Sequence, residues 1–317
     1  MKWPFSRGKN KASKQGIVSV YESPNSISMV YLVPGETQPT IVDQFFEVGE
    51  DQMRRQTVLT KFVSKNDLKG VPCTYVLGFS EYSLSLVDAP SVPKAEVAKA
   101  VSWTLRDILS FPVEEAIIDT FELPFHRAND DMKLLYAAIV RKTVVSRIET
   151  FINETGLELK YVDIPELALR NLAEKSPDIN SGCAFVKLVS NGGKIIMCSE
   201  NNLCVSRSFN LDLEDLTTEK GPETLEALSL EVQRAFDYVN SLFRKSIPNV
   251  LVLAPTVCDK MVIESSIKSS LDCEINYLKL SDHFVFENAI DEYDEPDYVF
   301  PIGAAIRKEE PIDAPTN

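Results

Sequence analysis

The segment from Cys183 to Phe209 constrains the fold more than any other part of the sequence, because it combines three short apolar runs with two tight turns. The runs CAFVKLV, KIIMC and LCVSRSF are separated by residues 191–193 (NGG) and 199–202 (SENN). Asparagine and glycine adopt the positive φ of a tight turn at low cost. The pattern therefore predicts a three-stranded antiparallel meander.

Strands and helices alternate on both sides of this meander. The other predicted strands are a hairpin over 16–33 and runs at 41–48, 73–78, 83–87, 114–123, 132–140, 157–162, 249–254 and 274–278, with 83–87 as the hairpin partner of 73–78. The predicted helices are 93–111, 144–155, 164–175, 222–245, 257–271 and 298–307. Two sets of such elements, each opening with a hairpin-rich sheet, predict a duplicated α/β arrangement with a crevice between two lobes.

A chain of 317 residues is long enough for two lobes with separate cores. We expect a first lobe over residues 16–178, which includes a small subdomain at about 41–160, and a second lobe over residues 179–297. A closing helix at 298–308 is expected to pack back on the first lobe. Residues 309–317, which include two prolines, are expected to form a disordered tail.

The first 15 residues are interpreted as a flexible basic start. They carry five basic residues and no acid, together with two aromatic residues: Lys2, Arg7, Lys9, Lys11, Lys14, Trp3 and Phe5. Such a segment either stays solvated or leans on an anionic membrane surface. The sequence leaves both readings open.

The composition excludes several classes of function. A formal net charge of -14 at pH 7 argues against a general nucleic-acid binder, which needs clustered lysine and arginine. No window holds the run of about 18 apolar residues that a membrane span requires, and no apolar stretch follows the N-terminus as in a secretory signal. Two histidines, and six cysteines without CxxC spacing, predict reduced, buried thiols and no metal site.

Four motifs, in the same order along the chain, resemble those of PilM-type pilus assembly proteins. They are VAKAVSWTLRDILSFPVEEA at 97–116, similar to that family's helix and FP-x-E turn, GLELKYVDIPELAL at 156–169, EVQRAFDY at 231–238 and YVFPIGAAIR at 298–307. The resemblance covers about residues 16–307. The stretch 103–124 is most similar to the branch that serves MSHA-type pili, the MshI proteins.

The resemblance implies an actin-like α/β fold, a ribonuclease H-like duplicated fold of two lobes with an inserted small subdomain. It also implies a cytoplasmic protein, peripheral at the inner membrane of a Gram-negative bacterium, that clasps the N-terminal cytoplasmic tail of a single-span PilN-like membrane protein. Such a protein lies beneath the type IV pilus assembly platform and near its assembly ATPase, with self-association as a further implied contact. PilM-type proteins also bind ATP in the crevice between the lobes.

The residues that align with the nucleotide site depart from the pattern of actin-like ATPases. The aspartate of the first hairpin falls on Tyr21, and the second hairpin has Lys187 and Val189 in place of aspartate and glycine. Aspartates hold Mg²⁺ directly or through water, which tyrosine and lysine do not do. A β-branched side chain also obstructs the approach of backbone N–H groups to phosphate. We therefore expect neither ATP nor Mg²⁺ as a cofactor.

Five residues remain candidates for a degenerate nucleotide site: Ser23, Lys187, Ser190, Gly192 and Gly193. Lys187 could meet a phosphate as a point charge, or it could pair within the protein. The two glycines either open the backbone to a phosphate or serve only the turn. The adenosine loop of the family is represented by residues 254–256 (APT), in which the proline removes a backbone donor.

The partner's tail is expected to dock as an extended peptide in a groove on the first lobe, with the small subdomain as one wall. The apolar candidates for that wall are Trp103, Phe111, Phe121, Leu123 and Phe125. The alternative is that these side chains belong to the core. A charge at a groove position is expected to abolish partner binding without lowering thermal stability, whereas a charge in the core lowers both.

The sequence therefore favours a scaffold of a type IV, MSHA-like pilus platform that has no catalytic activity. Two alternatives stay open. One is an active actin-like ATPase or kinase of the same platform. The other is the cytoplasmic portion of a type II secretion platform protein, which has a similar fold but continues into a membrane span.

Overall fold

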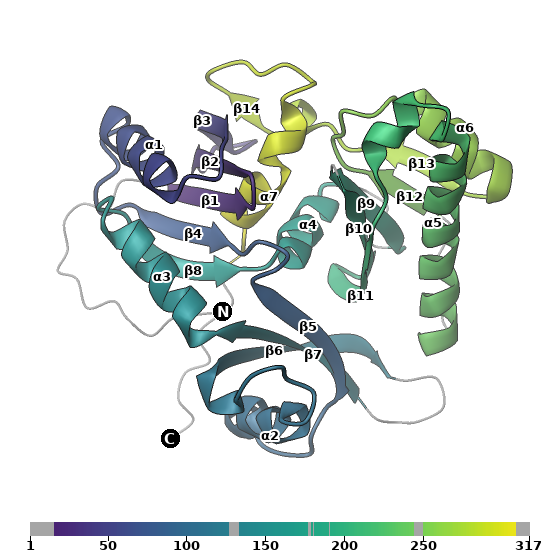
Figure 1. Cartoon of the computed structure of the whole chain (residues 1–317), viewed down its shortest axis with the longest axis horizontal. Coiled ribbons are helices and arrows are strands. Elements are labelled where there is room, and N and C mark those ends of the chain that lie inside the picture. The colour runs from purple at the N-terminus through teal and green to yellow at the C-terminus, as the bar shows by residue number, and fades with distance from the viewer. Residues whose placement is uncertain are drawn as a thin grey trace.

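The computed structural model describes residues 16–126, 133–176, 179, 181–189, 191–243 and 250–308, so the predicted flexible start and disordered tail lie outside the described residues. The described chain forms three β-sheets with helices between and around them (Figure 1). None of the helices in these ranges has the length and apolar character needed to cross a membrane.

The first sheet has six strands in the order β14-β3-β2-β1-β4-β8. Their bounds are β1 Ile17–Ser23, β2 Ser26–Val33, β3 Thr40–Val48, β4 Pro72–Val76, β8 Glu158–Asp163 and β14 Val285–Phe286. β1 and β2 are antiparallel and pair Ile17 with Leu32, which confirms the predicted hairpin. Alternate residues of β1 face opposite sides, so that Val18 and Val20 pack in one hydrophobic cluster and Tyr21 in another.

Two helices cover the Val18 side of this sheet: α1 (Gln52–Lys65) and α3 (Lys142–Asn153). Helix α1 was not among the helices predicted from the sequence. The side chain of Asp51 caps its first turn by accepting a hydrogen bond from the Met53 N–H at 2.9 Å. Its buried residues follow at helical spacing, namely Val58, Leu59, Phe62 and Val63.

The second sheet has five strands in the order β11-β10-β9-β12-β13. Their bounds are β9 Cys183–Val189, β10 Gly192–Ser199, β11 Asn202–Phe209, β12 Val250–Leu253 and β13 Glu274–Tyr277. The antiparallel pairing of β9 with β10 and of β10 with β11 confirms the predicted meander. The helices α5 (Gly221–Phe243) and α6 (Lys260–Ser270) pack on the outer face of this sheet (Figure 1).

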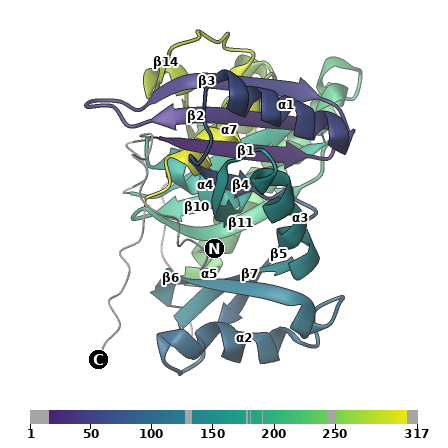
Figure 2. The ribbon, with the colours of Figure 1, turned by 90° about the vertical axis from the view of Figure 1, so that its left-hand side faces the viewer.

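The third sheet is separate and has the order β5-β7-β6, with bounds β5 Tyr82–Asp88, β6 Ala116–His126 and β7 Lys133–Arg141. The predicted pairing of 83–87 with 73–78 is wrong, because β5 pairs with β7 while β4 lies between β1 and β8. Helix α2 (Val97–Leu105) covers one face of this sheet (Figure 2) and ends well before the predicted residue 111. This sheet runs over 82–141, whereas β3 and β4, inside the expected 41–160 subdomain, belong to the first sheet.

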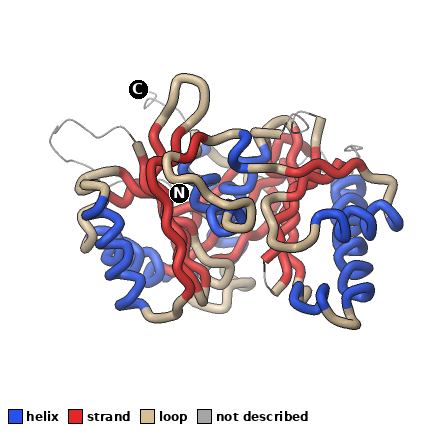
Figure 3. The backbone as a smooth tube through the Cα atoms, turned by 90° about the horizontal axis from the view of Figure 1, so that it is seen from above, coloured by secondary structure: helices blue, strands red, loops and turns tan. Residues whose placement is uncertain are grey.

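The first and second sheets sandwich two helices, α4 (Pro165–Ala173) and α7 (Glu295–Ala305), as Figure 3 shows from above. A Cβ on Gly303 of α7 would lie 2.2 Å from the carbonyl oxygen of Ala168 on α4, so only glycine permits this approach. The Asn171 amide donates a hydrogen bond to the Gly303 carbonyl at 2.9 Å. The two central helices therefore join the C-terminal part of the described chain to its middle, between the two sheets that carry the candidate site residues described below.

Candidate functional site

The turn of the first hairpin satisfies its polar groups within the protein. Ser23, a predicted nucleotide-site residue, donates from its Oγ to the Asn25 side chain at 2.9 Å and lies 2.6 Å from the Ser26 Oγ. The Arg55 guanidinium, from α1, donates to the Pro24 carbonyl at 2.9 Å. The turn is thus held by its own side chains and by an arginine behind it.

Tyr21 occupies the position that the resemblance assigns to the first aspartate. Its ring packs against that of Phe300 on α7, with centroids 4.7 Å apart, and Phe79 lies edge-on to the same ring at 5.7 Å. Burial, followed by repulsion from the Glu81 carboxylate, raises the pKa of Tyr21 far above its usual value. This position therefore presents a neutral aromatic ring within a cluster drawn from three elements.

Lys187 occupies the position of the second aspartate and is buried, with 3% of its surface exposed. Its ammonium donates to the Pro255 carbonyl at 3.0 Å, across to the loop that follows β12. Burial lowers its pKa to about 8, and the nearby Asp297 carboxylate opposes that change. Burial in turn raises the pKa of Asp297. Lys187 thus pairs within the protein, one of the two readings that the sequence left open.

The two glycines of the second hairpin have a packing role. A Cβ on Gly192, which has a φ of +137°, would meet the Phe209 carbonyl oxygen at 2.0 Å. On Gly193 it would lie 2.4 Å from the Phe209 ring. Both glycines are therefore required by the close approach of β11, a reason that the sequence analysis did not consider. Ser190, the remaining candidate, lies outside the described residues.

A buried ion pair near this hairpin was not anticipated. Lys194 lies directly opposite Lys187 in the antiparallel pairing of β9 with β10. The two lysine side chains therefore extend from the same face of the sheet, and both are buried. Lys194 binds Glu166 of α4, with 2.5 Å between its Nζ and the carboxylate, and its ammonium lies 5.0 Å from the centre of the Phe79 ring. The signal was present in the sequence, because two lysines flank the turn at facing positions of a predicted hairpin.

The chemistry that these residues offer differs from that of a magnesium-nucleotide site. The side chains at the two aspartate positions are an aromatic ring and an ammonium, and neither is a ligand for Mg²⁺. Among the described residues, no group of three or more His, Cys, Asp or Glu side chains is placed to hold a metal ion. These residues do not fit a magnesium-bound triphosphate.

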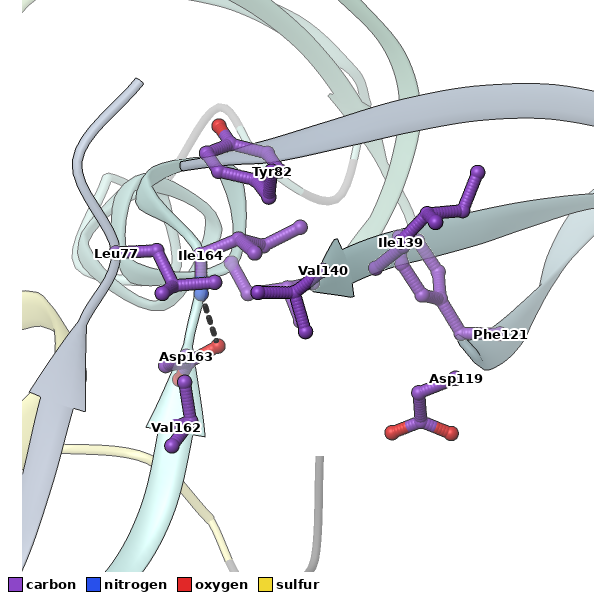
Figure 4. Close-up of a pocket in the computed structure, with 11 residues that line it drawn as sticks. Leu77, Tyr82, Asp119, Phe121, Ile139, Val140, Val162, Asp163 and Ile164 are labelled. Carbon is purple, nitrogen blue, oxygen red and sulfur yellow. Dashed lines mark hydrogen bonds between the residues drawn. The ribbon is translucent and has the colours of Figure 1, made fainter. Parts of the chain in front are cut away.

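A small cavity of about 30 Å³ lies where the third sheet meets β8, β4 and α4 (Figure 4). Apolar side chains make up most of its wall, with two carboxylates among them: Leu77, Tyr82, Phe121, Val140, Val162, Ile164, Leu167, Asp119 and Asp163. Asp163 accepts from the Ile164 N–H at 2.9 Å and from the Arg307 guanidinium at 3.1 Å. The cavity is thus a mainly apolar depression with acidic groups.

The predicted wall residues of the partner groove do not lie together. Phe121 lines the cavity and packs against Tyr136, with ring centroids 5.4 Å apart, and Leu123 is buried in the large core cluster. Phe111 packs instead with the α2 side of the third sheet, beneath the Arg141 guanidinium at 3.9 Å. Trp103, on α2, has 65% of its surface exposed. Nothing is described of the Phe125 side chain.

Comparison with solved structures identifies the architecture. The chain is similar to a structure described as a PilM-PilN type IV pilus biogenesis complex, with a TM-score of 0.71, 12% identity, 92% of this chain and 97% of that chain covered. It is also similar to a Bacteroides thetaiotaomicron protein of unknown function with an actin-like ATPase fold, with a TM-score of 0.51, 13% identity, 84% of this chain and 91% of that chain covered. The chain therefore has an actin-like α/β fold of two lobes, as the resemblance implied.

Other comparisons add less. The cytoplasmic domain of EpsL, an inner-membrane component of the type II secretion system of Vibrio cholerae, matches with 14% identity over 81% of this chain and 96% of that chain. Its TM-score of 0.48 is too low to bear on function. No protein-family model matches the chain, and no curated protein matches its sequence.

Proposed function

We propose that this protein is a non-catalytic scaffold of a type IV pilus assembly platform, and that it holds the N-terminal cytoplasmic tail of a single-span PilN-like inner-membrane protein. The observation that carries the proposal is the likeness of fold, over 92% of the chain, to a PilM-PilN complex. Because actin-like folds host both enzymes and binding proteins, the choice between them rests on the sites.

The residues at the nucleotide-site positions support a scaffold more than an ATPase. Tyr21 and Lys187 stand where aspartates would hold Mg²⁺, and both are committed to contacts within the protein. Gly192 and Gly193 are packed against Phe209, so their backbone serves the β10–β11 contact. The contact of Lys187 and the two glycines is thereby explained by packing around the second sheet.

The cavity beside the third sheet is the proposed docking place for the tail. An extended peptide that runs along this junction would place an apolar side chain in the cavity and backbone groups along the strands. Asp119, which is only partly buried, would favour a basic side chain or an amino terminus next to that apolar residue, whereas the buried Asp163 is already paired with Arg307. The proposed groove is thus formed by the strands of the third sheet together with β8 and α4, and Trp103 and Phe111 are not part of it.

The finer parts of the proposal concern the biological system. The protein is proposed to act on the cytoplasmic side of the inner membrane of a Gram-negative bacterium, near the assembly ATPase, and in the MSHA-type branch. Genes for MSHA-type pilins, a secretin and an assembly ATPase beside this gene would support that assignment. Neighbouring genes for general secretion components would instead favour the type II secretion alternative.

Binding of the tail can be tested with a charge reversal and a matched control. A fluorescein-labelled peptide of the PilN-like protein's cytoplasmic tail is titrated with the wild-type chain, Asp119→Lys and Asp107→Lys. Asp107 is an exposed carboxylate just after α2, and α2 covers the face of the third sheet away from the cavity. We expect Asp119→Lys to weaken binding at least about tenfold, with an unchanged melting temperature, and Asp107→Lys to bind normally. Equal affinities for the three proteins would contradict the proposed docking place.

The ATPase alternative has its own test. The purified chain is titrated with a fluorescent ATP analogue and Mg²⁺, and phosphate release is followed. We expect no saturable binding and no turnover. Micromolar binding with turnover that is abolished in Gly192→Ala, while the tail peptide still binds, would replace the scaffold with an active ATPase.

A further inference from the structure

Glu166 is a buried carboxylate that joins separate parts of the molecule. It lies on α4, and 1% of its surface is exposed. It accepts hydrogen bonds from Lys194 of β10 at 2.5 Å, from Tyr82 of β5 at 2.5 Å and from Ser206 of β11 at 3.2 Å. One side chain thus ties a central helix both to the second sheet and to the third sheet.

Tyr82 belongs to this junction and to the proposed tail groove at the same time. Its ring lines the cavity, while its hydroxyl points away from Phe121 and Asp119 (Figure 4) and donates to Glu166. Tyr82 is the first residue of β5 and follows the turn that leads out of the first sheet, where Glu81 accepts from the Gly78 N–H at 2.8 Å. Tyr82 therefore lies where the chain passes from the first sheet to the third sheet.

We propose that Tyr82 couples binding of the tail in the groove to the hydrogen bonds by which Glu166 holds α4 to the second sheet, here called the clamp. This inference rests on the proposed function. The cavity of about 30 Å³ has room for little more than one water-sized group. An apolar side chain of the tail can enter only if a lining side chain moves. Leu77, Val140 and Ile164 are buried in the core, whereas Tyr82, Phe121 and Leu167 are partly exposed. Phe121 packs against the Tyr136 ring and Leu167 lies on the central helix α4, so Tyr82, at the end of an edge strand, is the side chain expected to turn outward.

The movement of Tyr82 has a consequence on the other side of the junction. When its ring turns out of the cavity wall, the hydroxyl leaves Glu166, and only Lys194 and Ser206 remain as partners of the carboxylate. Tail binding and the Tyr82–Glu166 hydrogen bond are then mutually exclusive. By linkage, the bond opposes tail binding to the same extent that the tail weakens the clamp on β10 and β11.

The first experiment needs no ligand. Amide hydrogen exchange of residues 192–209 is compared in the full-length wild type, Tyr82→Phe, Ser206→Ala and Tyr277→Phe. Tyr277→Phe is the matched control, because its hydroxyl also binds a carboxylate, that of Glu264 at 2.6 Å, but on an exposed surface. We expect exchange at least about threefold faster in the first two variants and unchanged in the control. Unchanged exchange in Tyr82→Phe would overturn the clamp.

The second experiment adds the labelled tail peptide described above. Peptide binding is expected to speed exchange of residues 192–209 in the wild type and to cause no further change in Tyr82→Phe. Tyr82→Phe is expected to bind the peptide about tenfold more tightly, the equivalent of one hydrogen bond to a charged group. Ser206→Ala, which leaves the groove intact, is expected to bind as the wild type does.

The outcomes separate the two claims. If the peptide binds the wild type and Tyr82→Phe equally well, with the same change in exchange, the coupling is overturned while the proposed function stands. If the peptide binds neither protein, the proposed function and the coupling to a tail both fail, and the first experiment still decides whether Tyr82 holds the second sheet.

Discussion

Replacement of Lys187 by methionine is expected to change stability with opposite sign at neutral and alkaline pH. The ammonium is buried and, among the described residues, donates to the Pro255 carbonyl at 3.0 Å. Burial lowers its pKa from 10.5 to about 8, with Asp297 opposing the change. A lysine whose folded pKa lies below its unfolded pKa destabilises the fold at low pH, and that penalty disappears as pH rises from about 8 toward 10.5.

The size of the effect follows from this change in pKa. A displacement from 10.5 to about 8 corresponds to roughly 3 kcal/mol at pH 7, where both the folded and the unfolded forms are protonated. Methionine has a similar volume and no charge, so Lys187→Met removes this penalty. The substitution also leaves the buried Pro255 carbonyl without its donor, which costs about 1–2 kcal/mol. The variant should therefore be about 1–2 kcal/mol more stable at pH 7 and about 0–1 kcal/mol less stable at pH 10, where a little of the penalty remains.

The assay is urea unfolding followed by far-UV circular dichroism at pH 7, 8, 9 and 10. The useful quantity is the difference between variant and wild type, because tyrosines and cysteines that do not interact with Lys187 affect both proteins alike. Lys268→Met serves as a control, since this lysine is exposed and pairs only with Glu264 on its own helix. A Lys187→Met difference that keeps the same value from pH 7 to pH 10 would refute the reasoning.

Three further predictions concern packing and charge. Lys194→Met should destabilise the fold by about 3–5 kcal/mol in urea unfolding, because it leaves the buried Glu166 without its cation, and the double change Lys194→Met with Glu166→Leu should recover most of that loss. Gly193→Ala should cost about 1–3 kcal/mol through its clash with the neighbouring strand, whereas Gly49→Ala, with nothing within 4 Å of the added Cβ, should not. Trp103→Ala should change stability by no more than about 0.5 kcal/mol, and a larger loss would mean that this exposed ring supports the core.

Local patterns predicted the parts of the fold that depend on neighbouring residues. The three strands of the 183–209 meander follow from alternating apolar runs and Asn-Gly turns, and the pairing of β9, β10 and β11 confirms them. The long helix α5 follows from the spacing of buried residues such as Leu228, Val232 and Val239. In both cases the decisive contacts lie within a few residues or across one turn.

Pairing between distant strands could not be read in the same way. Residues 73–78 and 83–87 lie next to each other in sequence and look like a hairpin, yet β4 and β5 belong to different sheets. The partner of β5 is β7, about 50 residues further along, and no local pattern specifies it. Helix α1 was missed although its signals are local, because Gly49 ends the preceding strand, Asp51 caps the helix and the apolar residues follow at helical spacing.

The same distinction between local and distant contacts applies to the candidate site. The chemical departures at Tyr21 and Lys187 were visible in the sequence, because they depend only on residue type. The partners of those residues, Phe300 and Pro255, come from distant elements and required the structure. The role of Glu166 was not predicted. This residue lies within the motif at 156–169, which was interpreted as a strand and a helix and not for its carboxylate.

The motifs that carry the resemblance are explained by packing, and this bears on what they can say about function. Asp163 of the second motif and Arg307 of the fourth bind each other at 3.1 Å. Gly303 of the fourth motif allows α7 to touch Ala168, which belongs to the second. Residues under such constraint preserve the junction of the two lobes whatever the protein binds. If the protein holds a tail as proposed, the choice of that tail is expected to depend on side chains of the groove that take no part in these contacts, such as Asp119 and Phe121 of β6.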